Sequence, residues 1–337
     1  MTVRIAQLVR TYHDVVNEAF LRDFPGIEVA KAHSADELAA ALEGAEILHV
    51  YNSGFTPEVG KAVRQHGTAL RWIQFTTVGV DIAEENGLID GVWVTNIGDV
   101  RQRVLAGHAV ALMLGVMRGF RAYAPHRAAH DWAREKMFPH MIAPEGGTMV
   151  LCGMGRIGQD IARKAKAFDM EVICVTRADR PASPSIDRVV PRGRLREVLP
   201  AADVVMIAMP LDDETRHFIG AAELALMKET AVLVNISRGA VVDEAALAEA
   251  LAAGRLRGAG LDVFETEPLP ASSPLWDLPN AILTPHLGGQ GGAEQWHRLS
   301  ELVRDNTRRY LAGEPLLNVV IAPAGAAPRA ANREQGR

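Results

Sequence analysis

The 337-residue sequence has few cysteines, no excess of positive charge and no long apolar run. Its two cysteines, Cys152 and Cys174, both fall in apolar stretches expected to form buried strands. We therefore expect no disulfide framework, and a reduced, cytoplasmic location. The formal net charge of -5 leaves no basic footprint, which argues against nucleic acid as a partner.

Membrane-spanning and targeting patterns are missing as well. The most apolar run, residues 104–117, is interrupted by His108 and is too short to cross a bilayer. Residues 1–10 lack the successive regions of a signal peptide. We expect no membrane association, and the sequence shows no internal repeat at solenoid spacing.

The sequence is organised around the glycine-rich stretch Gly153-Met154-Gly155-Arg156-Ile157-Gly158. An apolar run at 149–152 predicts a buried strand before it, helical periodicity at 159–168 predicts a helix after it, and 171–175 predicts a second strand. In such a unit the glycines allow a tight turn, close approach of a pyrophosphate and close helix packing. The helix N-terminus then binds phosphate. The stretch predicts a dinucleotide site rather than a structural turn alone.

Strand and helix patterns alternate along most of the chain. Before residue 100, strands are predicted at 3–9, 46–50, 70–75 and 92–96, with helices at 34–43 and 56–65. After residue 200, strands are predicted at 203–209, 231–236, 258–263 and 281–284, with helices at 221–226 and 243–253. This alternation predicts an α/β fold with doubly wound parallel sheets, whose ligands bind at the carboxyl ends of the strands.

The remaining segments have other patterns. A long apolar helix is predicted at 104–119, and the His-, Arg- and Ala-rich stretch after it, around Trp132, lacks a clean period. We interpret that stretch as an arm that packs on another subunit, with an intrachain loop as the alternative. A terminal helix at 295–312 is expected to pack on the first hundred residues. Residues 322–337 have the composition of a disordered tail.

Three charged residues follow predicted strand ends: Arg238, Glu267 and His286. Each alone is typical of a surface charge, but a cation, a carboxylate and an imidazole at one sheet edge predict a common site. These groups suit the reduction of a 2-keto acid. Arg238 would hold and polarise the acid, His286 would give a proton to the developing alkoxide, and Glu267 would keep the imidazole oriented and charged.

The end of the second strand of the dinucleotide unit indicates which cofactor is used. NAD-binding proteins of this type carry an acidic residue there, which hydrogen-bonds the ribose and repels the 2′-phosphate of NADP. In this chain the position falls on Thr176, followed by Arg177 and Arg180. A hydroxyl and a guanidinium favour a phosphate monoester, so we predict NADP. NAD remains the alternative, because Arg177 can point to solvent and Asp179 can supply the carboxylate.

With these motifs the chain resembles the D-isomer-specific 2-hydroxyacid dehydrogenases, of the glyoxylate/hydroxypyruvate reductase type. The resemblance covers residues 46–310 and lies in the glycine stretch and in four motifs at 210–217, 235–243, 260–268 and 284–289. It implies that Arg238, Glu267 and His286 are the catalytic residues of an oxidoreductase acting on a small 2-keto acid such as glyoxylate or hydroxypyruvate.

The resemblance also implies the remaining site residues, and we expect no metal. The substrate carboxylate would be bound by Arg238 and by the backbone N–H groups of Val78 and Gly79. Asp262 would contact the nicotinamide carboxamide. The cofactor-binding residues would be Gly153, Gly155, Arg156, Ile157, Gly158, Thr176, Arg177, Pro210, Thr215, Ile236 and Asp262.

The implied organisation is a split substrate domain, residues 1–100 plus 290–321, and a dinucleotide-binding domain, residues 101–289. The second would carry a dimerisation arm at 119–147 and form a homodimer, with hinges near Gly98 and Gly289 and the tail at 322–337. Two features depart from the family pattern. Gly107 stands where the family commonly has Glu, and Arg101 and Arg103 add cations near the first hinge. Those cations either reach a second anionic group of the substrate or lie in a solvated loop.

Other functions of this fold compete with the reductase. A cofactor-sensing corepressor shares the frame and even the catalytic residues, and turnover of glyoxylate would distinguish the two. Formate dehydrogenases carry Gln at the position of Glu267. Biosynthetic phosphoglycerate dehydrogenases usually append a regulatory domain, for which the tail leaves no room.

Overall fold

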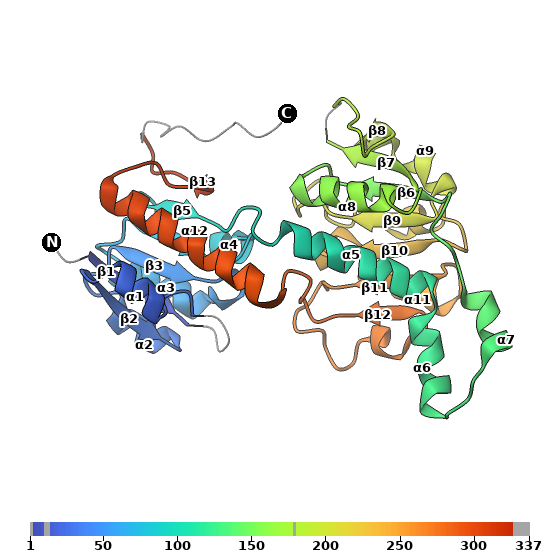
Figure 1. The fold of residues 1–337 in the computed structure, drawn as a ribbon, viewed down its shortest axis with the longest axis horizontal. Helices are drawn as coiled ribbons and strands as arrows, with labels where there is room; N and C mark the ends of the chain where they lie inside the picture. The colour runs from blue at the N-terminus through green and yellow to red at the C-terminus, as the bar shows by residue number, and fades with distance from the viewer. Residues whose placement is uncertain (1–2, 10–13, 178–179, 326–337) are drawn as a thin grey trace. The chain divides into compact units, whose positions relative to one another are not determined.

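The computed structural model describes residues 3–9, 14–177 and 180–325 (Figure 1). The chain divides into two compact units, each built on its own sheet. Unit 1 comprises Met1–Arg101 and Gly291–Arg337, and unit 2 comprises Gln102–Gln290.

Unit 1 contains a six-stranded sheet in the order β13-β5-β4-β3-β1-β2. Neighbouring strands are parallel except β13, which pairs antiparallel with β5. The strands are β1 (Val3–Leu8), β2 (Ile27–Ala32), β3 (Ile47–Val50), β4 (Trp72–Phe75), β5 (Trp93–Thr95) and β13 (Val319–Ile321). The helices are α1 (Glu18–Asp23), α2 (Ala35–Ala41), α3 (Pro57–His66), α4 (Asp81–Glu85) and α12 (Gly292–Ala312).

Helices cover both faces of the unit 1 sheet, and its central strands β3 and β4 are buried on both sides. Leu38 of α2 and Val63 of α3 belong to the core cluster on one face. Phe20 of α1 and Val303 of α12 pack with Trp72 on the other face. The helix α12, from the far end of the chain, therefore completes the core of unit 1.

Unit 2 contains a seven-stranded parallel sheet in the order β12-β11-β10-β9-β6-β7-β8. The strands are β6 (Thr148–Cys152), β7 (Glu171–Thr176), β8 (Arg188–Pro191), β9 (Val204–Ile207), β10 (Val232–Asn235), β11 (Gly258–Leu261) and β12 (Ala281–Leu283). The helices are α5 (Gln102–Met117), α6 (Phe120–Ala128), α7 (Arg134–Met137), α8 (Arg156–Lys166), α9 (Leu195–Val198), α10 (Ala221–Leu224) and α11 (Glu244–Ala252).

The strand order of unit 2 reverses between β6 and β9. The chain moves outward from β6 to β8 and then returns to β9 on the other side of β6. In open parallel sheets this switch point opens a crevice beyond the carboxyl ends of the strands, where ligands bind. The glycine stretch directly follows β6 and therefore lies at this point.

The predicted fold class, α/β with two doubly wound sheets, is confirmed, with β13 as one antiparallel edge strand. The strands β2, β8 and β13 were not predicted, because all three are edge strands with little or no alternation of buried residues. No helix was predicted in the stretch after α5, but α6 and α7 form there. No residue of α6 is buried, so the helix has no apolar stripe to detect.

The expected tail lies outside the described residues from position 326 onward. Among the described residues, no single helix is long and apolar enough to cross a membrane. The helices α5 and α6 reach that length and apolar character only when they are taken together, and they meet at a bend of 62°. Much of α5 belongs to the core of unit 2. Cys152 and Cys174 are buried and unbridged, and burial raises the pKa of both thiols to about 12.

Candidate active site

The glycine stretch divides its roles among three positions. Gly153 has φ of 114°, and a Cβ there would lie 2.4 Å from the carbonyl oxygen of Ala208. A Cβ on Gly158 would lie 2.0 Å from the carbonyl oxygen of Gly153. Gly155 is the N-cap of α8, and a Cβ there would meet nothing within 4 Å. The open backbone at Gly155 and the N-terminus of α8 fit a pyrophosphate, with exposed Arg156 and half-buried Ile157 as the next residues.

The turn predicted to meet the adenosine ribose lies at the end of β7. Thr176 is its last residue and is 6% exposed, and Arg177 follows with an exposed side chain. Arg180 is also exposed, while Asp179 lies outside the described residues. Thr176 and Arg177 are therefore consecutive residues at the carboxyl edge of the sheet, the first buried and the second exposed.

The loop after β9 is held from within by Thr215. This side chain is fully buried, and its hydroxyl donates to the carbonyl of Pro210 at 2.8 Å and accepts from the N–H of Asp212 at 2.7 Å. Pro210 is exposed, and Ile236, directly after β10, is 4% exposed. Thr215 thus shapes the loop, while the role of these residues toward a cofactor stays a prediction.

Arg238 stands in a turn after β10 that Asn235 organises. The Asn235 amide donates to the carbonyl of Arg238 at 2.9 Å and accepts from the N–H of Ser237 at 3.1 Å. The half-buried guanidinium of Arg238 donates to the carbonyl of Ser237 at 2.8 Å. The direction of the guanidinium is therefore set by the turn itself.

His286 and Glu267 form a hydrogen-bonded pair after β12 and β11. The imidazole Nδ1 lies 2.7 Å from Oε2 of Glu267, and Oε1 accepts from the N–H of Phe264 at 3.1 Å. Burial raises the pKa of Glu267, but the hydrogen bond and charge of His286, the N–H of Phe264 and the charge of Arg238 outweigh it and leave the pKa lowered. An ionised Glu267 keeps a proton on Nδ1 and leaves Nε2 of His286 for proton exchange.

Asp262 is 1% exposed and anchors the loop that carries His286. Its carboxylate accepts from the hydroxyl of Thr284 at 2.6 Å and from the N–H groups of Leu287 at 2.9 Å and Gly288 at 2.8 Å. His108 of α5 lies 3.4 Å from the same carboxylate. Burial raises the pKa of Asp262, yet these donors, His108 foremost, leave it lowered.

Two glycines allow the catalytic loops to pack closely on their surroundings. A Cβ on Gly239 would lie 1.8 Å from the carbonyl carbon of Phe264, and one on Gly288 would lie 2.7 Å from Oδ2 of Asp262. The turn after β10 therefore packs directly on the loop after β11. Any side chain at Gly239 would push these two loops apart.

The turn predicted to bind the substrate carboxylate follows β4 in unit 1. The hydroxyl of Thr77 accepts from the N–H of Asn52 at 3.0 Å and donates to the carbonyl of Gly79 at 3.1 Å. The amide of Asn96 donates to the carbonyl of Val78 at 2.7 Å, and Val78 is 40% exposed. The turn is thus fixed from both sides, with Val78 at the surface.

The structure brings Arg238, Glu267, His286 and Asp262 together at the carboxyl ends of the neighbouring strands β10, β11 and β12. Sequence reasoning missed His108, which supports Asp262 through both its own contact and Thr284, 3.0 Å from its Nε2. No local pattern links position 108 to position 262. In the part of the chain that the structure describes, no group of His, Cys, Asp and Glu is placed to hold a metal ion.

Known proteins resemble the chain over three quarters of its length or more. It is 38% identical over 262 residues to the glyoxylate reductase of Pyrococcus furiosus, covering 76% of this chain and 77% of that protein. It is 31% identical over 329 residues to the glycerate dehydrogenase of Methylorubrum extorquens, covering 96% and 100%. The solved NADPH-dependent glyoxylate/hydroxypyruvate reductase of Sinorhizobium meliloti, in complex with NADP and malonate, has a TM-score of 0.77 at 28% identity, covering 95% and 97%.

A family model supports the same relationship. Residues 110–288 match the model described as D-isomer specific 2-hydroxyacid dehydrogenase, NAD binding domain. That range contains the glycine stretch, Arg238, Glu267 and His286. The chain therefore belongs to the D-isomer specific 2-hydroxyacid dehydrogenase family and is an oxidoreductase with a nicotinamide-cofactor domain.

Proposed function

We propose that the protein reduces a small 2-keto acid, such as glyoxylate or hydroxypyruvate, to the D-2-hydroxy acid, with NADPH as the favoured cofactor. The observation that carries the proposal is the 2.7 Å pair of His286 and Glu267 beside Arg238, in the unit that holds the glycine stretch. Relatives named glyoxylate reductase and glyoxylate/hydroxypyruvate reductase support the substrate class. A cofactor-sensing corepressor would not consume NADPH when glyoxylate is added.

The chain's own residues supply everything except the hydride. A bound reduced nicotinamide cofactor would supply that hydride. The glycine stretch would hold its pyrophosphate, the turn at Thr176 its adenosine ribose, and the loop at Pro210 would also contact the cofactor. In unit 1, the N–H groups of Val78 and Gly79 bind the substrate carboxylate. In unit 2, the guanidinium of Arg238 holds the acid and polarises the keto oxygen. His286 gives the proton from Nε2 to the developing alkoxide, and Glu267 stabilises the imidazolium until then.

We also propose a homodimer formed through the segment 119–147. Three large apolar side chains of this segment are exposed: Phe120 at 69%, Trp132 at 80% and Phe138 at 56%. Exposed apolar groups gathered on one segment mark an interaction surface.

Sedimentation should therefore give twice the 36.4 kDa mass of one chain. Trp132→Glu should shift the mass toward the monomer, because a charge is then buried in an apolar interface. Trp276→Glu is the control, since Trp276 is 48% exposed but lies outside the segment. A monomer at micromolar wild-type protein would refute the proposal.

His286→Ala should lower kcat for glyoxylate by about 100-fold to 10,000-fold, because a positioned proton donor is lost. NADPH binding, followed by fluorescence titration, should stay intact. The exposed His297 of α12 provides the control, and His297→Ala should keep wild-type turnover. Wild-type turnover by His286→Ala would sink the assignment.

Glu267→Gln should change the pH dependence of reduction. Reduction needs a protonated His286, so activity is lost as the pH rises. The ionised Glu267, whose pKa is lowered, stabilises that imidazolium, and an uncharged amide does not. The pH at which kcat/KM falls should therefore be lower in Glu267→Gln than in the wild type. Superimposable profiles would show that Glu267 is only a surface carboxylate.

The cofactor preference is tested by the ratio of kcat/KM for NADPH and NADH with glyoxylate. We expect the wild type to favour NADPH, and Thr176→Asp and Arg177→Ala each to lower the ratio by about 10-fold, the worth of one charge-assisted hydrogen bond. Arg255→Ala is the control. Arg255 is exposed and precedes β11, so it lies at the amino ends of the strands, whereas Thr176 and Arg177 lie at the carboxyl ends. A wild type that favours NADH and does not respond to either change would contradict the assignment.

A further inference from the structure

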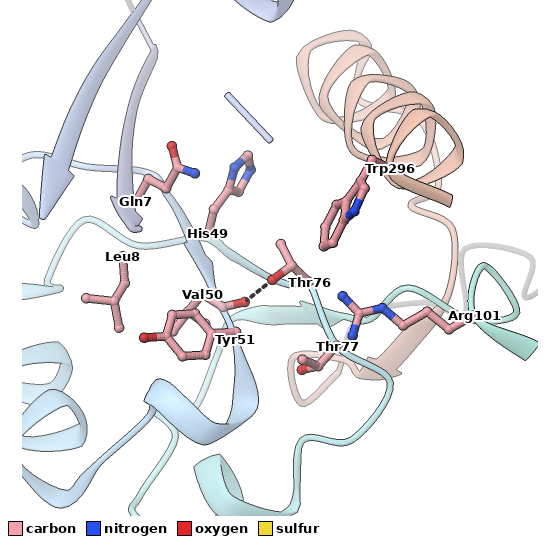
Figure 2. Close-up of a pocket in the computed structure, with 9 residues that line it drawn as sticks. All are labelled: Gln7, Leu8, His49, Val50, Tyr51, Thr76, Thr77, Arg101 and Trp296. Atoms are coloured by element: carbon pink, nitrogen blue, oxygen red, sulfur yellow. Dashed lines mark hydrogen bonds between the residues drawn. The ribbon is translucent and has the colours of Figure 1, made fainter. Parts of the chain in front are cut away.

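A small polar pocket lies in unit 1 at the carboxyl ends of β1, β3 and β4. Gln7, His49, Thr76 and Thr77 line it, and its volume is about 10 Å³. This is room for one water-sized group. Figure 2 shows Gln7 and His49 beside one another, with Thr76 between them and the side chains of Trp296 and Arg101. We call it the strand-end pocket.

The pocket lies against one end of a row of buried polar side chains that crosses the sheet. Gln7, His49, Gln74 and Thr95 are successive partners in register on four neighbouring strands, and each is at most 2% exposed. One half of the row is fully bonded: the hydroxyl of Thr95 and the amide of Asn306 both donate to Oε1 of Gln74, each at 2.9 Å. The other half, at Gln7 and His49, faces the pocket.

The polar atoms of this second half lack partners. The amide nitrogen of Gln7 donates to Asp14 at 3.1 Å, but its Oε1 and both ring nitrogens of His49 have no hydrogen-bond partner among the described residues. Buried polar atoms left in this way cost stability. The ring of His49 lies edge-on to Phe20 and Trp72, with centroids 6.4 and 5.9 Å away, so an apolar ring would pack there without that cost. A polar group from outside the chain is therefore expected in the pocket.

The chemistry of the wall selects what that group is. Burial lowers the pKa of His49 to about 4 against the opposing charge of Asp14, so the imidazole is neutral at pH 7. A neutral imidazole offers one donor and one acceptor, and Oε1 of Gln7 adds a second acceptor. A hydroxyl, which both donates and accepts, satisfies this set. A carboxylate only accepts, so it would face Oε1 of Gln7 with Asp14 behind it.

The strand-end pocket shares a wall with the turn proposed to hold the substrate carboxylate. Thr77 lines the pocket, and its hydroxyl is bonded to the carbonyl of Gly79 in that turn. The pocket therefore adjoins the turn itself.

We propose that the strand-end pocket binds the C3 hydroxyl of a 3-hydroxy-2-keto acid, so that Gln7 and His49 determine specificity for such substrates. This inference rests on the proposed function, because the substrate carboxylate must occupy the turn at Val78 and Gly79. The pocket is too small for a second carboxylate or a phosphate. The guanidinium of Arg101 lies over the Trp296 ring, 5.7 Å from its centroid, and both side chains line the pocket beside α12.

The test compares hydroxypyruvate with pyruvate, which carries a hydrogen in place of the C3 hydroxyl. With NADPH, the wild-type kcat/KM should favour hydroxypyruvate by about 10-fold or more, and Gln7→Leu and His49→Phe should each reduce that ratio by about 10-fold. His49→Phe should also raise the melting temperature, since it removes two unpartnered nitrogens. Gln65→Leu, at an exposed position of α3, is the matched control and should keep the wild-type ratio.

A second measurement makes the result independent of turnover. Hydroxypyruvate should raise the melting temperature of the wild type more than pyruvate does, and the difference should vanish in both pocket variants. If no 2-keto acid is turned over, the proposed function fails. The difference between the two melting-temperature shifts still tests whether the pocket binds the C3 hydroxyl. Equal effects of the two acids on the wild type, or variants with an unchanged ratio, would show that the pocket holds only a structural water.

Discussion

The buried carboxylate of Asp262 is the interaction on which the geometry of the catalytic loop depends. A charge out of contact with water is tolerated only when donors surround it, and here they come from α5 and from the loop after β12. The carbonyl of Asp262 also accepts the N–H of His286 at 2.9 Å, and His286 has φ of 52°, a left-handed conformation that is unfavourable for a non-glycine residue. The loop keeps this conformation because Asp262 binds it at several points.

Much of the site could be predicted because its residues follow strands. Arg238, Glu267 and His286 are separated in sequence, but a parallel sheet gathers the carboxyl ends of its strands at one edge. The glycine stretch was likewise predictable, since a strand and a helix flank it and each glycine has its own steric reason. Resemblance to a family added the names of the roles, and the matching family model confirmed that relationship.

What could not be predicted depends on contacts between distant segments. The contact of His108 with Asp262 joins α5 to the loop after β11, and no sequence pattern near position 108 predicts it. The polar row from Gln7 to Thr95 could not be predicted from the sequence. Which residues of neighbouring strands are partners depends on the strand order and register, and these are known only from the structure. Edge strands and the helix α6 escaped detection for a different reason: they bury too little to impose a period.

The contact at Gly239 has a consequence for how this site can diversify. Because main chain meets main chain there, the loop of Arg238 and the loop of Glu267 approach each other at Gly239 through backbone atoms. Substitutions elsewhere on these loops can alter the shape and charge offered to a substrate while the reactive groups keep their separation. The backbone contact thus maintains the arrangement of the reactive groups, while substitutions on the loops can change which substrate is bound.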